Sequence, residues 1–208
     1  MELWEPRISM KKLTIIGTGY GWENAPHGDD LEVWGITYLP TLRKDVNNVI
    51  DMNVYDDLRW GRFEQERNER VIDWCEENDV PYICLDNYPI DEIEKHFCVD
   101  YFSNTVDYAL ALGIYKGFKE IHLYGVNVTH DSEYAYQKPG IDFWCGVAIG
   151  RGIKVVIPGK KSAIMKTYNG LMYGYDRKQK QQLTKRLLKR IMDRQKPIPI
   201  IPVKNEEE

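Results

Sequence analysis

Cysteines, metal-binding spacings and long apolar runs are scarce in this sequence. Its 208 residues contain 4 cysteines, and no two of them form a C-x-x-C pair or a zinc-type spacing, so we expect reduced, mostly buried thiols. No apolar run approaches the roughly 20 residues of a membrane-spanning helix. The N-terminus also lacks the basic-then-apolar order of a signal peptide. These absences predict a soluble, cytoplasmic protein with no membrane partner.

Positive charge is concentrated near the C-terminus. From Asp176 to Lys196 there are nine Lys or Arg residues and two Asp residues, a net charge of +7. Because the whole chain has a net charge of −4, the remaining residues have a net charge of −11. One apolar stripe runs through this segment, made of Leu183, Leu187, Leu188, Ile191 and Met192. We predict a basic amphipathic helix that docks on the body or on another subunit, which makes a homo-oligomer one option. Nucleic-acid binding is not favoured, because no aromatic side chains interleave with the charges.

Strand-like and helix-like patterns alternate along the chain. Apolar runs predict six strands, within residues 11–17, 31–39, 47–53, 80–85, 119–127 and 153–158. Helical patterns fall within residues 62–78, 88–97, 103–118, 140–152 and 176–195. The alternation predicts an α/β, Rossmann-like, doubly wound and mainly parallel sheet. We expect one nucleotide-binding domain over residues 10–175, followed by the basic helix and an extended, Pro-rich tail over residues 176–208.

For two of the predicted helices, the sequence also indicates an apolar face or a capping residue. In the helix at 62–78, Phe63, Val71, Trp74 and Cys75 fall roughly on one face amid charged residues, which indicates an amphipathic helix. The helix at 103–118 begins with Ser103, a plausible N-cap.

A glycine-rich turn, Gly17-Thr18-Gly19-Tyr20-Gly21, follows the first predicted strand. Glycines let backbone N–H groups approach an anion closely, so the turn predicts a nucleotide or phosphate loop. Trp22 stands where the dinucleotide motif G-x-G-x-x-G has its third glycine, and a tight turn without a ligand is the alternative. The absence of G-x-x-x-x-G-K-[ST] argues against a P-loop NTPase.

Ser103, Asn104 and Thr105 begin a predicted helix. Small polar side chains and free N–H groups at a helix N-terminus suit a phosphate or a carboxylate. Simple capping of the helix explains the same residues equally well.

Polar and aromatic side chains crowd the segment LYGVNVTHDSEYAYQKPG, residues 123–140, after the fifth predicted strand. His130 beside Asp131 can act as a general base. Tyr134 and Tyr136 point the same way if the segment is extended, and can bind a phosphate, base or sugar; an aromatic plug of the sheet edge is the alternative. Because ligands bind beyond the carboxyl ends of parallel strands, this segment and the Gly17 turn should meet at one edge.

The sequence does not favour a metal site. Asp51, Asp56, Asp57 and Asp131 could bind Mg²⁺, but no D-x-D motif with nearby support marks them. The other three histidines are weaker candidates than His130. His122 lies inside a predicted strand and is expected to be structural, and His96 is expected at the surface or at its boundary. His27, in the loop after the first strand, is a weak site candidate.

The stretch from Tyr101 to Pro158 resembles a group of uncharacterised Rossmann-like proteins of bacteriophages and prophages. The segments that carry the resemblance are the polar helix start at Ser103, LYGVN, EYAYQKP, GRGIKVVIP and the later LMYGYD. It covers most of residues 12–175. The resemblance implies the fold, and the host cytoplasm as the location of a phage-encoded protein, but it implies no activity.

More distantly, the region is similar to bacterial sialyltransferases of the Campylobacter type and to proteins related to the archaeal pterin diphosphokinase. The sialyltransferase resemblance implies that Tyr134 holds the departing nucleotide phosphate and that residues 103–105 contact the nucleotide. In that family, Asn residues at the ends of the second and third strands bind nucleotide. The nearest positions here are Thr37, which is a departure, and Asn53.

The catalytic His of those sialyltransferases follows the Tyr segment, whereas this chain has no His after His130. Its role therefore falls to His130 or Asp131, or the reaction differs, or there is none.

The leading hypothesis is a nucleotide-binding, glycosyltransferase-like transferase that uses a nucleotide-activated donor. Its predicted catalytic residues are His130, Asp131 and Tyr134. Its predicted nucleotide-binding residues are Gly17, Thr18, Gly19, Tyr20, Thr37, Asn53, Ser103, Asn104, Thr105, Asn127 and Tyr136. The alternatives are a phage protein that binds or sequesters a nucleotide without catalysis, and a phage structural or assembly accessory that docks through its tail.

Overall fold

The computed structural model describes residues 12–28, 31–55, 61–128, 134–158 and 162–166, together with Lys185 and Lys189. Contacts divide the chain into a first unit, Met1–Met165, and a second, Lys166–Glu208. The basic helix predicted at 176–195 and the tail lie outside the described residues, apart from Lys185 and Lys189, and their role stays a prediction. Within the described part of the chain, no helix is both long and apolar enough to span a membrane.

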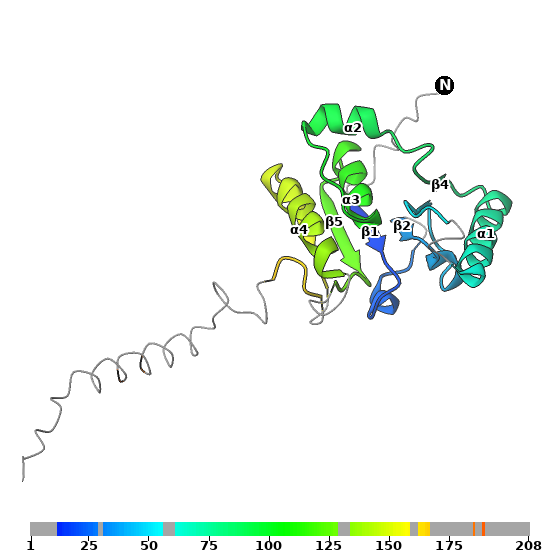
Figure 1. The fold of residues 1–208 in the computed structure, drawn as a ribbon, viewed down its shortest axis with the longest axis horizontal. Helices are drawn as coiled ribbons and strands as arrows, with labels where there is room; N and C mark the ends of the chain where they lie inside the picture. Colours follow the sequence, from blue (N-terminus) through cyan, green and yellow to red (C-terminus); the bar gives the residue numbers. More distant parts are fainter. Residues whose placement is uncertain are drawn as a thin grey trace, which may run out of the picture. The chain divides into compact units, whose positions relative to one another are not determined.

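The described residues of the first unit form a parallel sheet of six strands, as predicted, in the order β4-β3-β2-β1-β5-β6 (Figure 1). The strands are β1 (Lys12–Ile16), β2 (Glu32–Ile36), β3 (Asn48–Ile50), β4 (Tyr82–Ile83), β5 (Glu120–Tyr124) and β6 (Lys154–Val156). From β1 the chain steps to β2, β3 and β4 on one side, and later returns to place β5 on the other. The boundary between β1 and β5 is therefore the topological switch point of this sheet.

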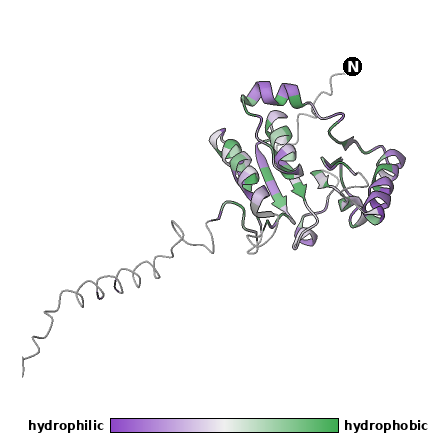
Figure 2. Ribbon diagram, in the orientation of Figure 1, coloured by the Kyte–Doolittle hydropathy of each residue, from purple (hydrophilic) through white to green (hydrophobic). Residues whose placement is uncertain are grey.

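Helices cover both faces of the sheet. They are α1 (Arg62–Glu77), α2 (Ile90–Phe97), α3 (Thr105–Tyr115) and α4 (Tyr134–Gly150), with short 3₁₀ turns η1 (Trp22–Asn24) and η2 (Leu39–Thr41). Residues of α2, α3 and α4 pack in one apolar cluster with Leu13 and Ile15 of β1. A second apolar cluster, on the other face of the sheet, contains Val71 and Cys75 of α1 and Ile16 of β1. Ile16 faces away from Ile15 because successive side chains of a strand point to opposite faces. Figure 2 shows the matching contrast between the largely apolar α4 and the mostly polar α1.

Helix α3 is capped by Asn104 and not, as predicted, by Ser103. The Asn104 side chain accepts hydrogen bonds from the backbone N–H groups of Val106 (2.8 Å) and Asp107 (3.3 Å). The Ser103 hydroxyl is instead directed at the Asp107 carboxylate, 2.8 Å away. The same hydroxyl lies 3.1 Å from the Gln137 carbonyl of α4, so Ser103 is engaged by Asp107 and Gln137 and the next residue, Asn104, caps the helix.

Helix α4 begins at Tyr134, six residues before the predicted start at Gly140. The prediction that Tyr134 and Tyr136 lie on an extended segment is therefore wrong. On a helix, residues two positions apart project about 200° from one another and do not share a face. Pro139 lies inside the helix and concealed this start, because proline removes one backbone hydrogen bond.

Helix α1 closely matches its predicted bounds, and its apolar face is buried only in part. Val71 and Cys75 are buried, whereas Phe63 is 64% exposed. Phe63 lies eight residues, about two turns, before Val71, and Cys75 lies four residues after it, so all three fall on one stripe. The stripe thus continues past the part of α1 that packs on the sheet.

Candidate functional site

The loop after β1 and the loop after β5 are joined at the switch point. The Gly17 N–H donates to the Tyr124 carbonyl (2.9 Å), and the Gly19 N–H donates to the Gly125 carbonyl (2.8 Å). The Asn127 side-chain amide donates to the Tyr20 carbonyl at 3.1 Å. The structure therefore brings together two of the predicted segments, which are about 100 residues apart in sequence.

The glycines of this junction are needed for the close approach of the two backbones. A Cβ atom added at Gly17 would lie 2.7 Å from the Gly125 carbonyl oxygen, and one at Gly19 would lie 2.6 Å from it. Gly125 itself has φ of 63°, in the left-handed region that favours glycine. Loop-to-loop packing thus accounts for these glycines by itself, and nucleotide binding by Gly17, Thr18, Gly19 and Tyr20 stays a prediction.

The start of α3 is tied to the start of α4 and to the end of β3. The Ser103 hydroxyl and the Asn104 side-chain amide both reach the Gln137 carbonyl, each at 3.1 Å. The Thr105 hydroxyl accepts a hydrogen bond from the Met52 N–H (3.4 Å). The capping alternative is therefore observed for Asn104, and the predicted ligand contacts of Ser103, Asn104 and Thr105 stay predictions.

Asp107 is a fully buried carboxylate at this helix junction. Its Oδ2 accepts hydrogen bonds from the Ser103 N–H and hydroxyl, both at 2.8 Å, whereas Oδ1 has no partner among the described residues. A Cβ atom at Gly140 of α4 would overlap Asp107 Oδ2 and Ser103 Oγ, so α3 and α4 meet closely here. Burial raises the pKa of Asp107 to about 6, against the opposing effect of its hydrogen bonds with Ser103 and Asn104.

The raised pKa of Asp107 predicts a pH-dependent contribution to stability. A carboxyl that holds its proton more tightly when folded stabilises the fold most at low pH, and this stability is lost as the pH rises from about 4 to about 6. The change is at most about 3 kcal/mol. Relative to wild type, Asp107→Asn should therefore gain unfolding free energy over this interval and change no further above pH 7. Urea unfolding at pH 4, 5, 6, 7 and 8 measures the difference, and parallel curves for the two proteins contradict the prediction.

A second buried carboxylate, Asp51, directly follows β3. It accepts hydrogen bonds from the Asn53 N–H (3.1 Å), the Asn53 side-chain amide (2.6 Å) and the Tyr55 hydroxyl (2.8 Å). Burial raises the pKa of Asp51, although these hydrogen bonds and the charge of Arg67 oppose the shift. The predicted nucleotide-binding Asn53 is thus held in place by Asp51.

Backbone strain and exposed aromatic rings also occur at this edge of the sheet. Thr37 after β2 has φ of 52° and Val128 after β5 has φ of 32°, both rare for β-branched residues. Tyr20 after β1 is 68% exposed, and Tyr136 in the first turn of α4 is 85% exposed. Strained residues cluster at functional sites more often than elsewhere.

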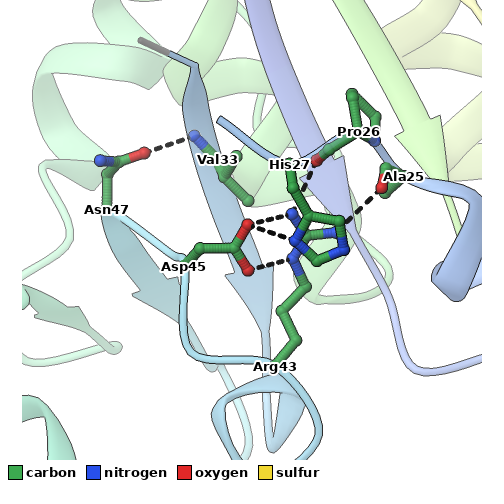
Figure 3. A network of polar contacts seen from close by, with 7 residues as sticks. All are labelled: Ala25, Pro26, His27, Val33, Arg43, Asp45 and Asn47. Atoms are coloured by element: carbon green, nitrogen blue, oxygen red, sulfur yellow. Dashed lines mark hydrogen bonds and ion pairs between the residues drawn. The ribbon is translucent and has the colours of Figure 1, made fainter. Parts of the chain in front are cut away.

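The weak candidate His27 belongs to a separate network that braces the loops before β2 and β3 (Figure 3). Its Nδ1 lies 2.8 Å from the Asp45 carboxylate, which also binds the buried guanidinium of Arg43. Arg43 in turn donates to the carbonyls of Ala25 (3.2 Å) and Pro26 (2.7 Å). Burial favours a higher pKa for Asp45, but the hydrogen bonds and charge of Arg43 outweigh it and lower the pKa. His27 thus has a structural partner away from the carboxyl edge.

Several predicted site residues belong to segments that the structure does not describe. His130 and Asp131, and the metal candidates Asp56 and Asp57, lie outside the described residues, and of Tyr134 only the backbone is described. Over the described ranges, no group of three or more His, Cys, Asp or Glu side chains could hold a metal ion. A cavity of about 370 Å³ at the C-terminal end of α1 contains none of the predicted residues.

No protein-family model and no curated protein matches the sequence. Three similar solved structures are sialyltransferases of Campylobacter jejuni. The sialyltransferase CstII in complex with a substrate analogue is 14% identical, with 71% of this chain and 80% of that chain covered and a TM-score of 0.36. CstII with cytidine 5′-monophosphate is 16% identical, covering 74% and 81%, with a TM-score of 0.36. An α-2,3-sialyltransferase without ligand is 12% identical, covering 81% and 84%, with a TM-score of 0.36.

These sialyltransferases are distant neighbours, and the fold of this chain is established by its own sheet. The resemblance to phage proteins and to pterin diphosphokinase relatives stays a prediction.

Sequence reasoning missed two charged residues on otherwise apolar helix faces. Asp107 stands in the run TVDYALALGIY, where every other buried residue is apolar or glycine. Arg67 stands on the α1 stripe between Phe63 and Val71. In each case the signal was present, namely a charge at an apolar position of the helical repeat.

Proposed function

We propose that this protein is a glycosyltransferase-like enzyme that uses a nucleotide-activated donor at the carboxyl edge of its sheet. The observation that carries the proposal is the arrangement of three segments at this edge. The loops after β1 and β5 are hydrogen-bonded to each other at the switch point, and the start of α3 is bonded to the start of α4 and to the end of β3. Open α/β sheets bind their ligands at such a position.

In the proposed reaction, an acceptor hydroxyl attacks the anomeric carbon of the donor sugar. The new glycosidic C–O bond forms as the bond from that carbon to the phosphate oxygen breaks, and the nucleotide leaves with the bonding electron pair. His130 or Asp131 takes the proton of the acceptor hydroxyl. The hydroxyl of Tyr134 donates a hydrogen bond to the leaving phosphate, where negative charge develops.

The nucleotide would lie between the Gly17–Tyr20 turn and the ends of β2 and β3, near Thr37 and Asn53. Two features support this placement: Asp51 holds the side chain of Asn53, and α3 and α4 begin at the same edge. The exposed Tyr20 and Tyr136 leave aromatic surface for a base or sugar at either side of the switch point.

A non-catalytic nucleotide-binding protein is the second candidate. The Ser103 and Asn104 side chains are engaged with Asp107, Gln137 and the α3 backbone, which leaves fewer donors for a reacting phosphate. Such a site would bind a nucleotide through backbone and aromatic groups alone.

Turnover and binding together test these candidates. A panel of sugar nucleotides is incubated with the protein, release of free nucleotide and transfer to sugar acceptors are followed by mass spectrometry, and binding is measured by calorimetry. We expect Tyr134→Phe to lower kcat on the order of 100-fold with little change in nucleotide affinity, and His130→Ala to lower kcat similarly.

Turnover that survives both changes contradicts the catalytic assignment. Tight nucleotide binding without turnover selects the second candidate. Absence of both binding and turnover overturns the proposal and leaves the assembly-accessory alternative.

A further inference from the structure

Arg67 is a cation on the apolar stripe of α1, at the carboxyl edge of the sheet. Four positions separate it from Phe63 on one side and from the buried Val71 on the other, so all three residues share one helix face. Its guanidinium carbon lies 3.8 Å from the centroid of the Tyr38 ring, just after β2. The same atom lies 5.6 Å from the centroid of the Phe63 ring.

The donors of Arg67 are not used within the described structure. A guanidinium carries five N–H donors in one plane, and none of them has a hydrogen-bond acceptor or ion-pair partner among the described residues. Tyr38 covers one face of the guanidinium, which holds the group in place without using the in-plane donors. A half-buried arginine that is held by stacking and has its N–H donors available is suited to bind a ligand with hydrogen-bond acceptors.

The charge around Arg67 favours a neutral acceptor over a second anion. The carboxylate of Asp51 is close enough for Arg67 to affect its pKa, which burial raises and Arg67 lowers. The positive charge of Arg67 is therefore partly balanced. An uncharged planar ring with oxygen or nitrogen acceptors loses less hydration at such a site than a phosphate would.

Phe63 supplies an apolar ring next to the guanidinium. Phe63 lies on the same helix face as the buried Val71 and Cys75, yet it is 64% exposed, because α1 extends beyond the part that packs on the sheet. An aromatic face beside a planar donor group is a common way to bind a nucleobase, which stacks on the ring and accepts hydrogen bonds at its edge.

We infer that Phe63 and Arg67 form the base-binding position of the ligand site, with the nucleobase stacked on Phe63 and hydrogen-bonded by Arg67. This inference rests on the proposed function, since it names the part of the site that holds the base. Two parallel N–H donors of a guanidinium match two adjacent acceptors. The favoured bases are therefore those with such a pair, cytosine through N3 and O2 and guanine through N7 and O6.

The experiment measures dissociation constants of CMP, GMP, UMP and AMP by calorimetry for the wild type and for variants. We expect the wild type to bind CMP and GMP roughly tenfold more tightly than UMP and AMP. Phe63→Leu should weaken all four by roughly tenfold, because it keeps apolar bulk and loses the stacking ring. Arg67→Gln and Arg67→Lys should both remove the preference among bases, since neither offers the paired donors.

The matched control is Tyr115→Leu, the same aromatic-to-aliphatic change on an exposed ring at the far end of α3, which should leave all four constants unchanged. Thermal unfolding of each variant checks that the fold is kept. Intermolecular NOEs between base protons and the Phe63 ring report the position of the base directly, whatever the stability of the variant.

If nucleotides bind with equal strength to wild type, Phe63→Leu and Arg67→Gln, the base position is wrong while the proposed function stands. Retention of the base preference by Arg67→Lys rejects the paired-donor geometry. Failure of the wild type to bind any of the four overturns both.

Discussion

Gly125→Ala is expected to lower the free energy of unfolding by about 2–5 kcal/mol, the sum of a backbone cost and an overpacking cost of about 1–3 kcal/mol. Gly125 has φ of 63°, and an alanine in this left-handed region costs about 1–2 kcal/mol. Its new methyl group would also overlap the Gly17 carbonyl oxygen and lie 2.8 Å from Cβ of Trp22. Because the atom that it meets is backbone, relief requires the loops after β1 and β5 to move apart. Urea unfolding followed by circular dichroism measures the loss.

The control for this experiment is Gly146→Ala. Gly146 is exposed in α4, and an added Cβ would have no neighbouring atom within 4 Å. Alanine is favoured over glycine in a helix by about 1 kcal/mol, so this variant should gain stability. If Gly125→Ala is as stable as wild type, the two loops are not in the contact described. Where Gly125→Ala still folds, we also expect weaker nucleotide binding, because the Gly17 turn is displaced.

Trp144→Ala is expected to lower the free energy of unfolding by about 3–5 kcal/mol. Trp144 of α4 is fully buried, and its ring stacks on Phe102 at 5.2 Å and meets Phe97 edge-on at 5.0 Å. Its indole N–H also donates to the Tyr101 carbonyl at 2.8 Å. Removal of the ring leaves a cavity where α4 supports the segment that leads to Ser103. The midpoint of urea unfolding, with an unchanged m-value, measures the loss.

Trp144→Phe separates the packing of the ring from its hydrogen bond. This variant keeps an aromatic side chain but leaves the Tyr101 carbonyl without its donor, so it should cost about 1–2 kcal/mol for the hydrogen bond plus a smaller packing loss. If Trp144→Phe is as unstable as Trp144→Ala, the loss of stability is not divided between ring packing and the hydrogen bond in this way.

The parallel sheet could be predicted from the sequence because its signals are local. The run KLTII is apolar and rich in β-branched residues, and it ends at glycines, which identifies a buried strand whichever strands lie beside it. The alternation of such runs with helical patterns restricts the topology to right-handed parallel crossovers. The bounds of α1 could be predicted for the same reason, since they depend on one amphipathic repeat.

The candidate site was predicted less completely, because its details depend on contacts between distant residues. The N-cap is Asn104 because the Ser103 hydroxyl is hydrogen-bonded to Asp107 and to the Gln137 carbonyl. Gln137 lies 34 residues further along the chain, so no local pattern reveals this contact. The start of α4 at Tyr134 was hidden by Pro139, which by local rules argues against a helix interior. The exposure of Phe63 depends on where the strands end beneath α1, which the helical repeat alone does not reveal.

By itself, the sequence determined that the chain builds six parallel strands with helices on both faces, and which loops leave their carboxyl ends. Only the tertiary structure decided that the glycines after β1 pack against the Gly125 carbonyl, that Asp107 is buried between α3 and α4, and that Arg67 lies on Tyr38 beside an uncovered ring. The physical reason is range: strand and helix preferences act within a few residues, whereas these positions depend on which distant backbone and side chains fill the space around them.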